Sequence, residues 1–171
     1  DRVDKDTKRR QLFYVFHAGS KDEQIITIAD ETDEKWQAPL SAIVEPNPKD
    51  AKQLFYCSEK DGYNHIYIAK LDAETPAATV SDPSAKVQEG GQRLKAEPVV
   101  TQITKGNWQV EWAKWTAGGD IAYSSTEESP DERQFYIYET AKRESWRLTS
   151  AEKGMKTGPQ MDENNAIPTL I

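Results

Sequence analysis

Three short segments of the chain repeat one pattern. Each has apolar residues around or beside a tyrosine, and each is followed by a turn and a second strand-like run. They are residues 12–15 (LFYV), 54–57 (LFYC) and 121–124 (IAYS). The first two begin 42 residues apart, and the second and third begin 67 residues apart, or 41 when the 26 residues of the polar segment 73–98 are set aside. Repeats of about 40–50 residues are typical of β-propellers, in which each repeat is one four-stranded blade. The sequence therefore predicts an all-β chain, a partial β-propeller with about two and a half four-stranded antiparallel blades.

The repeats divide residues 1–171, which we expect to form a single propeller fragment, into successive blades. The predicted parts are a blade part at 11–36, a blade at 40–104, a blade at 108–149 and an irregular tail at 151–171. Segment 73–98, inside the second of these parts, is rich in Ala, Thr, Ser, Pro, Gly and Gln and lacks both the helical and the strand period. We expect a mobile surface loop there, because the segment buries too little apolar area to offset its ordering entropy.

The outermost strands of the two fuller blades also match. Residues 102–104 (QIT) and 147–149 (RLT) lie 45 residues apart and have the same succession of residue types. Residues 59–62 (EKDG) predict a turn, and the strand predicted after it, 63–71, is apolar on both faces. Apolar residues on both faces indicate a strand that is buried between neighbouring blades.

The charge pattern argues against two classes of partner. The net charge is −7, and the 22 basic residues are scattered apart from the run 8–10, so no basic stripe fits a phosphate backbone and a nucleic-acid partner is not expected. No run of about 18 apolar residues is present, so no membrane span is predicted. The chain begins at Asp1 with neither a Met nor an apolar signal segment, and we expect it to be an excised or processed portion of a longer product.

The cysteine, the histidines and the clustered acids give little sign of chemistry. Cys57 lies in an apolar run, so we expect a small buried side chain. His17 and His65 have no partner serine or cysteine at a recognisable spacing, and a structural hydrogen bond between strands is the favoured role for His65. The acidic residues of segment 30–34, which are Asp30, Glu31, Asp33 and Glu34, lack the spaced ligand order of a calcium loop and predict a solvated loop. No metal site, cofactor or glycosidase-like carboxylate pair is therefore predicted.

The tryptophans and one arginine are assigned structural roles. Because Trp108, Trp112 and Trp115 lie in or next to one predicted strand and Trp146 lies on the outer strand of the same blade, packing between blades explains most of them. Stacking on a sugar or a proline ring is the alternative. Arg133 is predicted to tie its loop to a neighbouring carboxylate or carbonyl.

Three ordered motifs carry a family resemblance. They are residues 58–67 (SEKDGYNHIY), 102–110 (QITKGNWQV) and 126–136 (TEESPDERQFY). In this order and spacing they resemble the propeller domain of the dipeptidyl peptidase IV family of serine peptidases, and segment 32–36 resembles the stretch that precedes the first motif. The resemblance covers about residues 30–149, with segment 73–98 as its main departure.

The resemblance implies that the whole protein removes dipeptides from peptide N-termini, with Pro or Ala preferred in the second position. Family members carry the catalytic serine in a Gly-x-Ser-x-Gly elbow on a separate α/β-hydrolase domain. No such elbow occurs in this sequence, so no catalytic residue is predicted here. The expected partners are the remaining propeller blades, the hydrolase domain and the peptide substrate. A periplasmic or extracellular location is also implied.

The resemblance further suggests which residues face the substrate. The family segment that corresponds to Trp36, which precedes Pro39, lies near the central cavity, so Trp36 and Pro39 are the predicted substrate-facing residues. The paired glutamates that bind the substrate amino group in the family belong to an earlier blade. That role is therefore not assigned to Glu127 and Glu128, which lie in a different motif.

Two alternatives to a peptidase propeller stay open. One is a propeller-like module that binds proteins or glycans and has no peptidase attached. The other, an independent small enzyme, requires a nucleophile and a base that the sequence does not offer. Because a blade that lacks a neighbour exposes an apolar face, we expect the isolated chain either to self-associate through the exposed blade faces or to be marginally stable.

Overall fold

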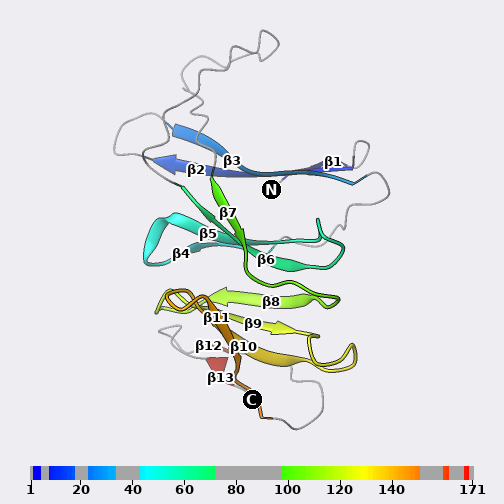
Figure 1. Ribbon diagram of the computed structural model, residues 1–171. Helices are drawn as coiled ribbons and strands as arrows, with labels where there is room; N and C mark the ends of the chain where they lie inside the picture. The colour runs from blue at the N-terminus through cyan, green and yellow to red at the C-terminus, as the bar shows by residue number, and fades with distance from the viewer. Residues whose placement is uncertain are drawn as a thin grey trace. The chain divides into compact units, whose positions relative to one another are not determined.

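A computed structural model describes residues 2–4, 8–17, 23–33, 43–71, 98–150, 160–161 and 168–169 (Figure 1). The side chains of residues 8–13, 26–33, 43–71 and 98–150 are included. The chain divides into two compact units, one formed by Asp1–Ser41 with Lys70–Val99 and the other by Ala42–Ala69 with Val100–Ile171. All regular structure in these described ranges is β-strand, and they contain no helix that could cross a membrane. The prediction of an all-β partial propeller is confirmed.

The first unit holds a three-stranded antiparallel sheet in the order β1-β2-β3. Its strands are β1 (Arg2–Asp4), β2 (Arg9–His17) and β3 (Glu23–Thr32). A bulge between Leu12 and Phe13 shifts the register of β2 against β3, which increases the local twist. Leu12, Ile26 and Ile28 are buried and form its apolar side.

The end of β3 corrects one prediction. Asp30 and Glu31 were expected in a solvated loop, but they lie in β3, opposite Gln11 and Arg10 of β2. Arg9 donates from Nε to Asp30 Oδ1 over 2.7 Å and pairs with the second carboxylate oxygen as well. The hydrogen bonds from Arg9 hold the pKa of Asp30 below its usual value. Opposite charges facing one another across two strands extend the sheet beyond the apolar residues that the sequence pattern detects.

The second unit holds two four-stranded antiparallel sheets and a two-stranded one, β12-β13. The strands of the first are β4 (Val44–Asn47), β5 (Asp50–Ser58), β6 (His65–Lys70) and β7 (Val99–Gln102). Those of the second are β8 (Val110–Trp115), β9 (Ile121–Ser125), β10 (Gln134–Glu139) and β11 (Glu144–Arg147), and the short pair is β12 (Gln160–Met161) and β13 (Pro168–Thr169). In each four-stranded sheet every strand pairs with its neighbour in the sequence, as in a propeller blade.

The hydrophobic core of this unit lies between the two four-stranded sheets. It consists of Phe55, Cys57, Ile66 and Ile68 from β5 and β6 and of Val110, Ala113, Trp115, Ile121, Tyr123, Tyr136 and Tyr138 from β8, β9 and β10. The Trp115 ring contacts Phe55 with centroids 5.6 Å apart, and its Nε1 donates to Glu45 O over 2.9 Å. A buried indole whose N–H has a partner contributes its apolar area without leaving an unsatisfied donor. The buried position predicted for Cys57 is confirmed.

The two sheets repeat the same internal contacts. Tyr56 and Tyr67 stack with centroids 5.5 Å apart in the first sheet, and Tyr123 and Tyr136 stack with centroids 5.3 Å apart in the second. These pairs come from adjacent strands, β5 with β6 and β9 with β10. The matching tyrosines of the sequence repeat therefore occupy matching places in the two sheets.

The segments that follow the outer strands also match, as predicted from residues 102–104 and 147–149. Ile103 N donates to Ile66 O over 2.8 Å, and Leu148 N donates to Phe135 O over 2.7 Å. The next residue is a threonine in both cases, and both threonines are buried. Similar sequence at this point therefore produces the same backbone pairing.

Some predicted boundaries moved and others lie outside the described residues. The strand expected at 63–71 begins at His65, and the first strand of the blade expected at 108–149 begins at Val110, because the residues before them lie in the connections at one end of the sheets. The loop predicted at 73–98 and the tail predicted at 151–171 fall almost wholly outside the described ranges, so these domain limits stay predictions.

Candidate binding cavity at one end of the two sheets

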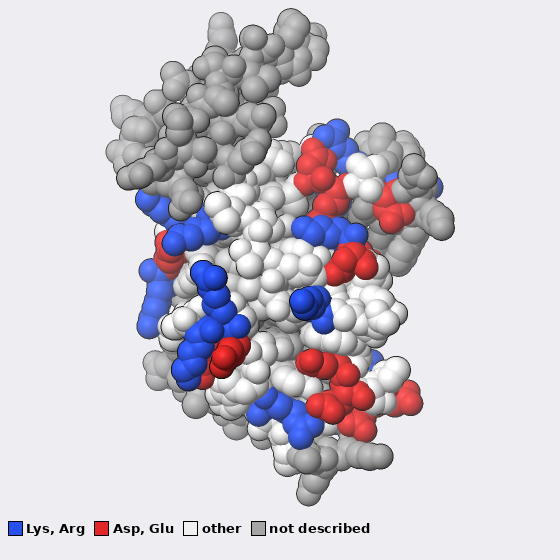
Figure 2. Space-filling model, viewed as in Figure 1, with Lys and Arg blue, Asp and Glu red and all other residues white. Residues whose placement is uncertain are grey.

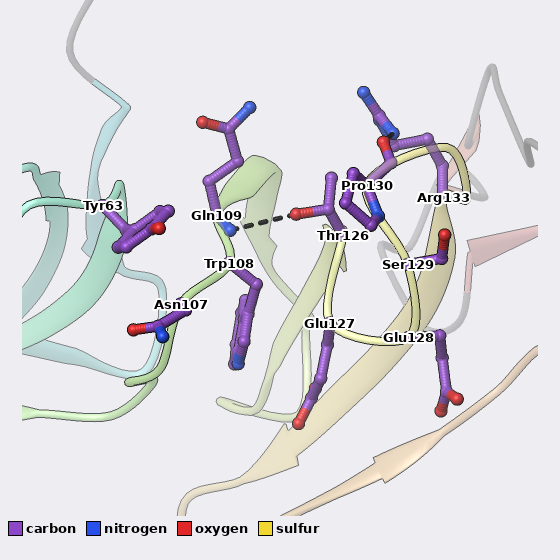
Figure 3. A pocket seen from close by; sticks show the side chains of 10 residues that line it. All are labelled: Tyr63, Asn107, Trp108, Gln109, Thr126, Glu127, Glu128, Ser129, Pro130 and Arg133. Atoms are coloured by element: carbon purple, nitrogen blue, oxygen red, sulfur yellow. Dashed lines mark hydrogen bonds between the residues drawn. The ribbon is translucent and has the colours of Figure 1, made fainter.

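A cavity of about 350 Å³ opens where three connections of the second unit meet (Figure 3). Tyr63 comes from the β5–β6 turn, residues 107–109 come from the β7–β8 loop, and residues 126–130 with Arg133 come from the β9–β10 loop. In antiparallel sheets these three connections lie at the same end of the strands. The sheets thus bring together loops that are far apart in the sequence.

Trp108 forms one wall of the cavity, and the glycine before it makes room for the indole. Gly106 has φ +135°, and a Cβ at this position would overlap Nε1 and Cδ1 of Trp108. On its other side the indole meets the His65 ring edge-on, with centroids 4.9 Å apart and an interplanar angle of 85°. The half-buried Trp108 is therefore held in place from two sides.

His65 anchors this wall through a hydrogen-bond network that fixes its tautomer. Nε2 lies 3.0 Å from Gly106 O, which can only accept, so Nε2 carries the proton. Nδ1 then accepts from the Thr104 hydroxyl at 3.0 Å, and the Thr104 oxygen accepts from Ile66 N–H at 2.9 Å. Both ring nitrogens of this fully buried side chain are satisfied. The structural role predicted for His65 is confirmed.

Arg133 lines the cavity, but its charge is engaged elsewhere. Its Nε donates to Glu111 Oε2 over 2.5 Å, and Nη1 donates to the carbonyls of Pro130 and Glu132 over 2.7 and 3.2 Å. Figure 3 shows the guanidinium pointing away from Glu127 and Glu128. The prediction that Arg133 ties its loop to a carboxylate and to carbonyls is confirmed.

The two carboxylates of the cavity differ in their partners. Glu128 pairs with Arg147 over 3.2 Å and accepts a long hydrogen bond of 3.5 Å from the Tyr136 hydroxyl. Glu127 has no hydrogen bond or ion pair with any residue whose side chain the structure describes. Partial burial and the neighbouring charge of Glu128 raise the pKa of Glu127. Glu127, whose side chain is exposed, is thus the carboxylate of the cavity that has no ion-pair partner among the described side chains, and His65 is the nearby group that lowers its pKa.

The phenols next to these carboxylates are shielded from water. Burial, as the largest cause, raises the pKa of Tyr123 to about 12, and burial together with Glu127 and Glu128 raises the pKa of Tyr136 as well. Both rings lie in the stacked pair beneath the β9–β10 loop. Phenols in this state stay protonated near neutral pH and act as packing groups rather than as proton carriers.

The lining of the cavity is aromatic, amide and carboxylate in character. The cavity lining offers two aromatic rings, amides and carboxylates, with no cysteine, and its single serine, Ser129, has no histidine among the lining residues. Within the described ranges no three His, Cys, Asp or Glu side chains are grouped to hold a metal ion. On the face in Figure 2, Lys and Arg lie in several separate groups, most of them next to Asp or Glu.

Comparison with known proteins places the chain in a family. The family model described as dipeptidyl peptidase IV (DPP IV) N-terminal region matches residues 2–166, nearly the whole chain. The chain belongs to this family. A solved structure, the crystal structure of Porphyromonas gingivalis dipeptidyl peptidase 4, matches with a TM-score of 0.55 and 21% sequence identity, over 90% of this chain. The match covers only 18% of that protein's chain, and at this identity the likeness concerns the fold.

The family resemblance expected from the three motifs is therefore confirmed, while the residues it pointed to are not tested. Trp36 and Pro39, the predicted substrate-facing residues, lie outside the described residues and stay predictions. His17 has a described backbone in β2 but no described side chain. The cavity was not predicted, although its Trp108 and Arg133 were both singled out from the sequence.

The tryptophans divide into buried and exposed ones. Trp115 is 2% exposed and lies in the core, and Trp112 and Trp108 are half-buried. Packing between blades does not explain Trp146, which is 47% exposed on β11 and donates from Nε1 to Glu139 over 2.8 Å. The reason is topological, since β11 is the edge strand of its sheet.

Proposed function

We propose that this chain is the non-catalytic propeller portion of a dipeptidyl peptidase IV-like serine peptidase, where it limits access to the catalytic site and helps to bind peptide substrates. The match of the family model over residues 2–166 carries the proposal. The absence of a Gly-x-Ser-x-Gly elbow from the sequence supports a division of labour in which an α/β-hydrolase domain of the same protein supplies the catalytic serine. No cofactor is required, and a periplasmic or extracellular location suits such an enzyme.

Peptidase activity is tested on the full-length protein that contains this segment. We expect it to release the chromophore from Gly-Pro and Ala-Pro chromogenic substrates and to lose this activity after treatment with a serine-reactive phosphonate. The 171-residue chain alone should leave the same substrates intact. A full-length protein that folds but shows no such activity contradicts the proposal and favours a propeller-like module that binds proteins or glycans.

Control of access is tested with the same N-terminal Ala-Pro sequence in two settings. In one it begins a short flexible peptide, and in the other it is joined without a linker to a stably folded domain. We expect the full-length enzyme to process the short peptide and to refuse the folded fusion until the fused domain is destabilised by mutation. Equal rates on both substrates contradict the gating role and leave the peptidase assignment standing.

Besides the hydrolase domain and the peptide substrate, the remaining propeller blades are a proposed partner of this chain. The core between the two four-stranded sheets shows how one sheet face is buried against the next, and a propeller repeats this contact at every blade. The isolated chain is therefore expected either to self-associate, which light scattering on a sizing column measures, or to be marginally stable, which thermal unfolding measures. A monodisperse monomer with cooperative unfolding at high temperature contradicts this expectation.

A further inference from the structure

We propose that the cavity between the β5–β6, β7–β8 and β9–β10 connections binds the side chain of a lysine or arginine from a polypeptide segment. The site lies at the loops of the second unit, and the inference does not depend on peptidase activity. Three features carry it: an uncompensated carboxylate, an aromatic wall and the contrast with a second turn of the same protein.

The carboxylate is Glu127. The other charges of the lining are already paired, Arg133 with Glu111 and Glu128 with Arg147. Figure 3 shows the side chains of Glu127, Glu128 and Trp108 pointing in the same direction, opposite to those of Gln109 and Arg133. The charge left over on this side of the cavity is negative, so the complementary ligand is a cation.

The aromatic wall selects the kind of cation. Trp108 lines the cavity, and Tyr63, which is 41% exposed, lines it from the β5–β6 turn. Lysine and arginine side chains carry an apolar stem that packs on such rings and a charged head that is attracted to their faces. A cavity with aromatic rings and an unpaired carboxylate satisfies both parts of the side chain, whereas a simple metal cation would use only the carboxylate.

The corresponding turn of the preceding sheet supplies its own cation. Lys60 follows the last residue of β5, Ser58, by two positions, and Glu127 follows the last residue of β9, Ser125, by two positions. Lys60 Nζ lies 3.8 Å from the centroid of the Tyr67 ring, which belongs to the first stacked tyrosine pair. The second stacked pair, beneath the β9–β10 loop, has a carboxylate at this position in place of a lysine. Arg147, the cation of this chain beside the second pair, is engaged by Glu128, so a cation for Glu127 is expected from another polypeptide segment.

The test is a titration of the full-length protein that contains this segment with blocked amino acids, followed by calorimetry and by the tryptophan indole N–H signals in NMR spectra. Nα-acetyl-lysine methylamide and Nα-acetyl-arginine methylamide are the probes. Nα-acetyl-norleucine methylamide is their uncharged control, and alanine methylamide offers an α-ammonium group without the stem. We expect saturable binding in the millimolar range, as suits a few contacts in an open cavity, with the two controls at least about 10-fold weaker.

Matched variants locate the binding. Glu127→Gln keeps the shape of the side chain and should weaken the lysine probe at least about 10-fold, because it removes the charge that selects the cation. Glu144→Gln removes an exposed carboxylate of β11 that does not line the cavity, and it should leave binding unchanged. Tyr63→Ala, a change at an exposed turn, should weaken the lysine probe by a smaller factor.

Four results overturn the proposal. Equal affinity of Glu127→Gln and the unchanged chain removes the carboxylate from the site, and equal affinity for the norleucine and lysine probes makes the cavity an apolar one. Equal affinity for alanine methylamide shows that an ammonium group is bound without its stem, which contradicts recognition of a side chain. Failure of both cationic probes to shift any indole signal at the solubility limit contradicts the proposal directly.

Discussion

The two four-stranded sheets share one hydrogen-bond scheme but differ in the residue that completes it. In each, a buried threonine after the outer strand accepts from a backbone N–H of the third strand: Thr104 from Ile66, and Thr149 from Phe135. In the first sheet His65 joins the threonine and also bonds Gly106 O, which is the carbonyl before the cavity wall. In the second sheet Gln134 holds that place and bonds Thr149. The threonine belongs to the blade, whereas the histidine connects the blade to the loop that carries Trp108.

The two turns that precede the third strands differ in charge. The β5–β6 turn places Lys60 over its tyrosine pair, and the β9–β10 loop places Glu127 and Glu128 beside the second pair. The cation of the first turn is used inside its own blade. In the second blade Arg147 pairs with Glu128, and Glu127 has no ion-pair partner among the side chains that the structure describes. The second turn therefore offers the carboxylate of Glu127 to a ligand.

The largest effect on the free energy of unfolding is expected at His65, which joins the first sheet to the loop that carries Trp108. His65→Ala should lower the free energy of unfolding by about 4 kcal/mol, because it leaves a cavity and removes the partners of Thr104 and Gly106 O. Gln134→Ala should lower it by about 2 kcal/mol, because it removes the hydrogen bonds to Thr149 and to Glu132, which lie in the same blade. Urea unfolding followed by circular dichroism measures both changes. Equal losses would show that the histidine contributes no additional connection.

Alkaline pH should weaken the second sheet through Tyr123. Its pKa is raised to about 12, from an ordinary value of 10.0. The folded state therefore keeps a proton that the unfolded chain releases, and stability present below pH 10 is lost as the pH rises toward 12. The loss reaches about 3 kcal/mol at 1.36 kcal/mol per pH unit.

Tyr123→Phe isolates this contribution. Urea midpoints at pH 8 and at pH 11 should differ less for Tyr123→Phe than for the unchanged chain, and the remaining difference reflects Tyr136 and Tyr138, whose pKa values burial also raises. Tyr63→Phe, at an exposed position, is the control and should keep the full difference. A Tyr123→Phe chain as sensitive to alkali as the unchanged one would show that the ring is not shielded.

Substitution of the two threonines compares the hydrogen bond that both sheets share with the contribution of the residue that differs between them, His65 or Gln134. Thr149→Val should cost about 1 kcal/mol, because it leaves Phe135 N–H and one bond of Gln134 unmet, while the flexible Gln134 side chain can turn to another partner. Thr104→Val should cost about 2 kcal/mol, because the His65 ring, bonded at its other nitrogen, cannot turn away from the lost hydroxyl. Guanidinium unfolding of the two variants is a sufficient measurement, and a smaller loss for Thr104→Val would reverse the comparison.

Features that repeat in the sequence could be predicted, because they arise from local patterns. The apolar segments with their tyrosine and the Ile-Thr and Leu-Thr pairs recur at blade spacing, and the structure shows the same strand and hydrogen bond at each. Where the repeat sets the neighbours of a residue, its environment can be predicted without knowing which distant residues it contacts. His65 was assigned correctly for the same reason, since its strand and its outer neighbour belong to one blade.

The cavity could not be predicted, because it arises from contacts between blades. Glu127 is one of 29 acidic residues, and nothing in the sequence shows that Glu128 and Arg133 have partners while Glu127 has none. The extension of β3 was missed on similar grounds, since it depends on Arg9 of β2 reaching Asp30, which lies diagonally opposite on β3. Charge pairing depends on which side chains meet, and the period of apolar residues carries no information about that.

The smallest expected effect is the most direct test of the contrast between the two turns. Lys60→Met keeps the apolar stem and removes the ammonium group over Tyr67, so it should lower the free energy of unfolding by about 0.5–1 kcal/mol. Glu127→Gln should change it by no more than about 0.5 kcal/mol, because a partly exposed carboxylate without an internal partner contributes little to stability. Denaturant midpoints at low ionic strength resolve the two values, and added salt should leave the small Glu127→Gln value unchanged. If Glu127→Gln destabilises the chain as much as Lys60→Met does, Glu127 has a partner within the protein, and the second turn has no unmet charge for a ligand to satisfy.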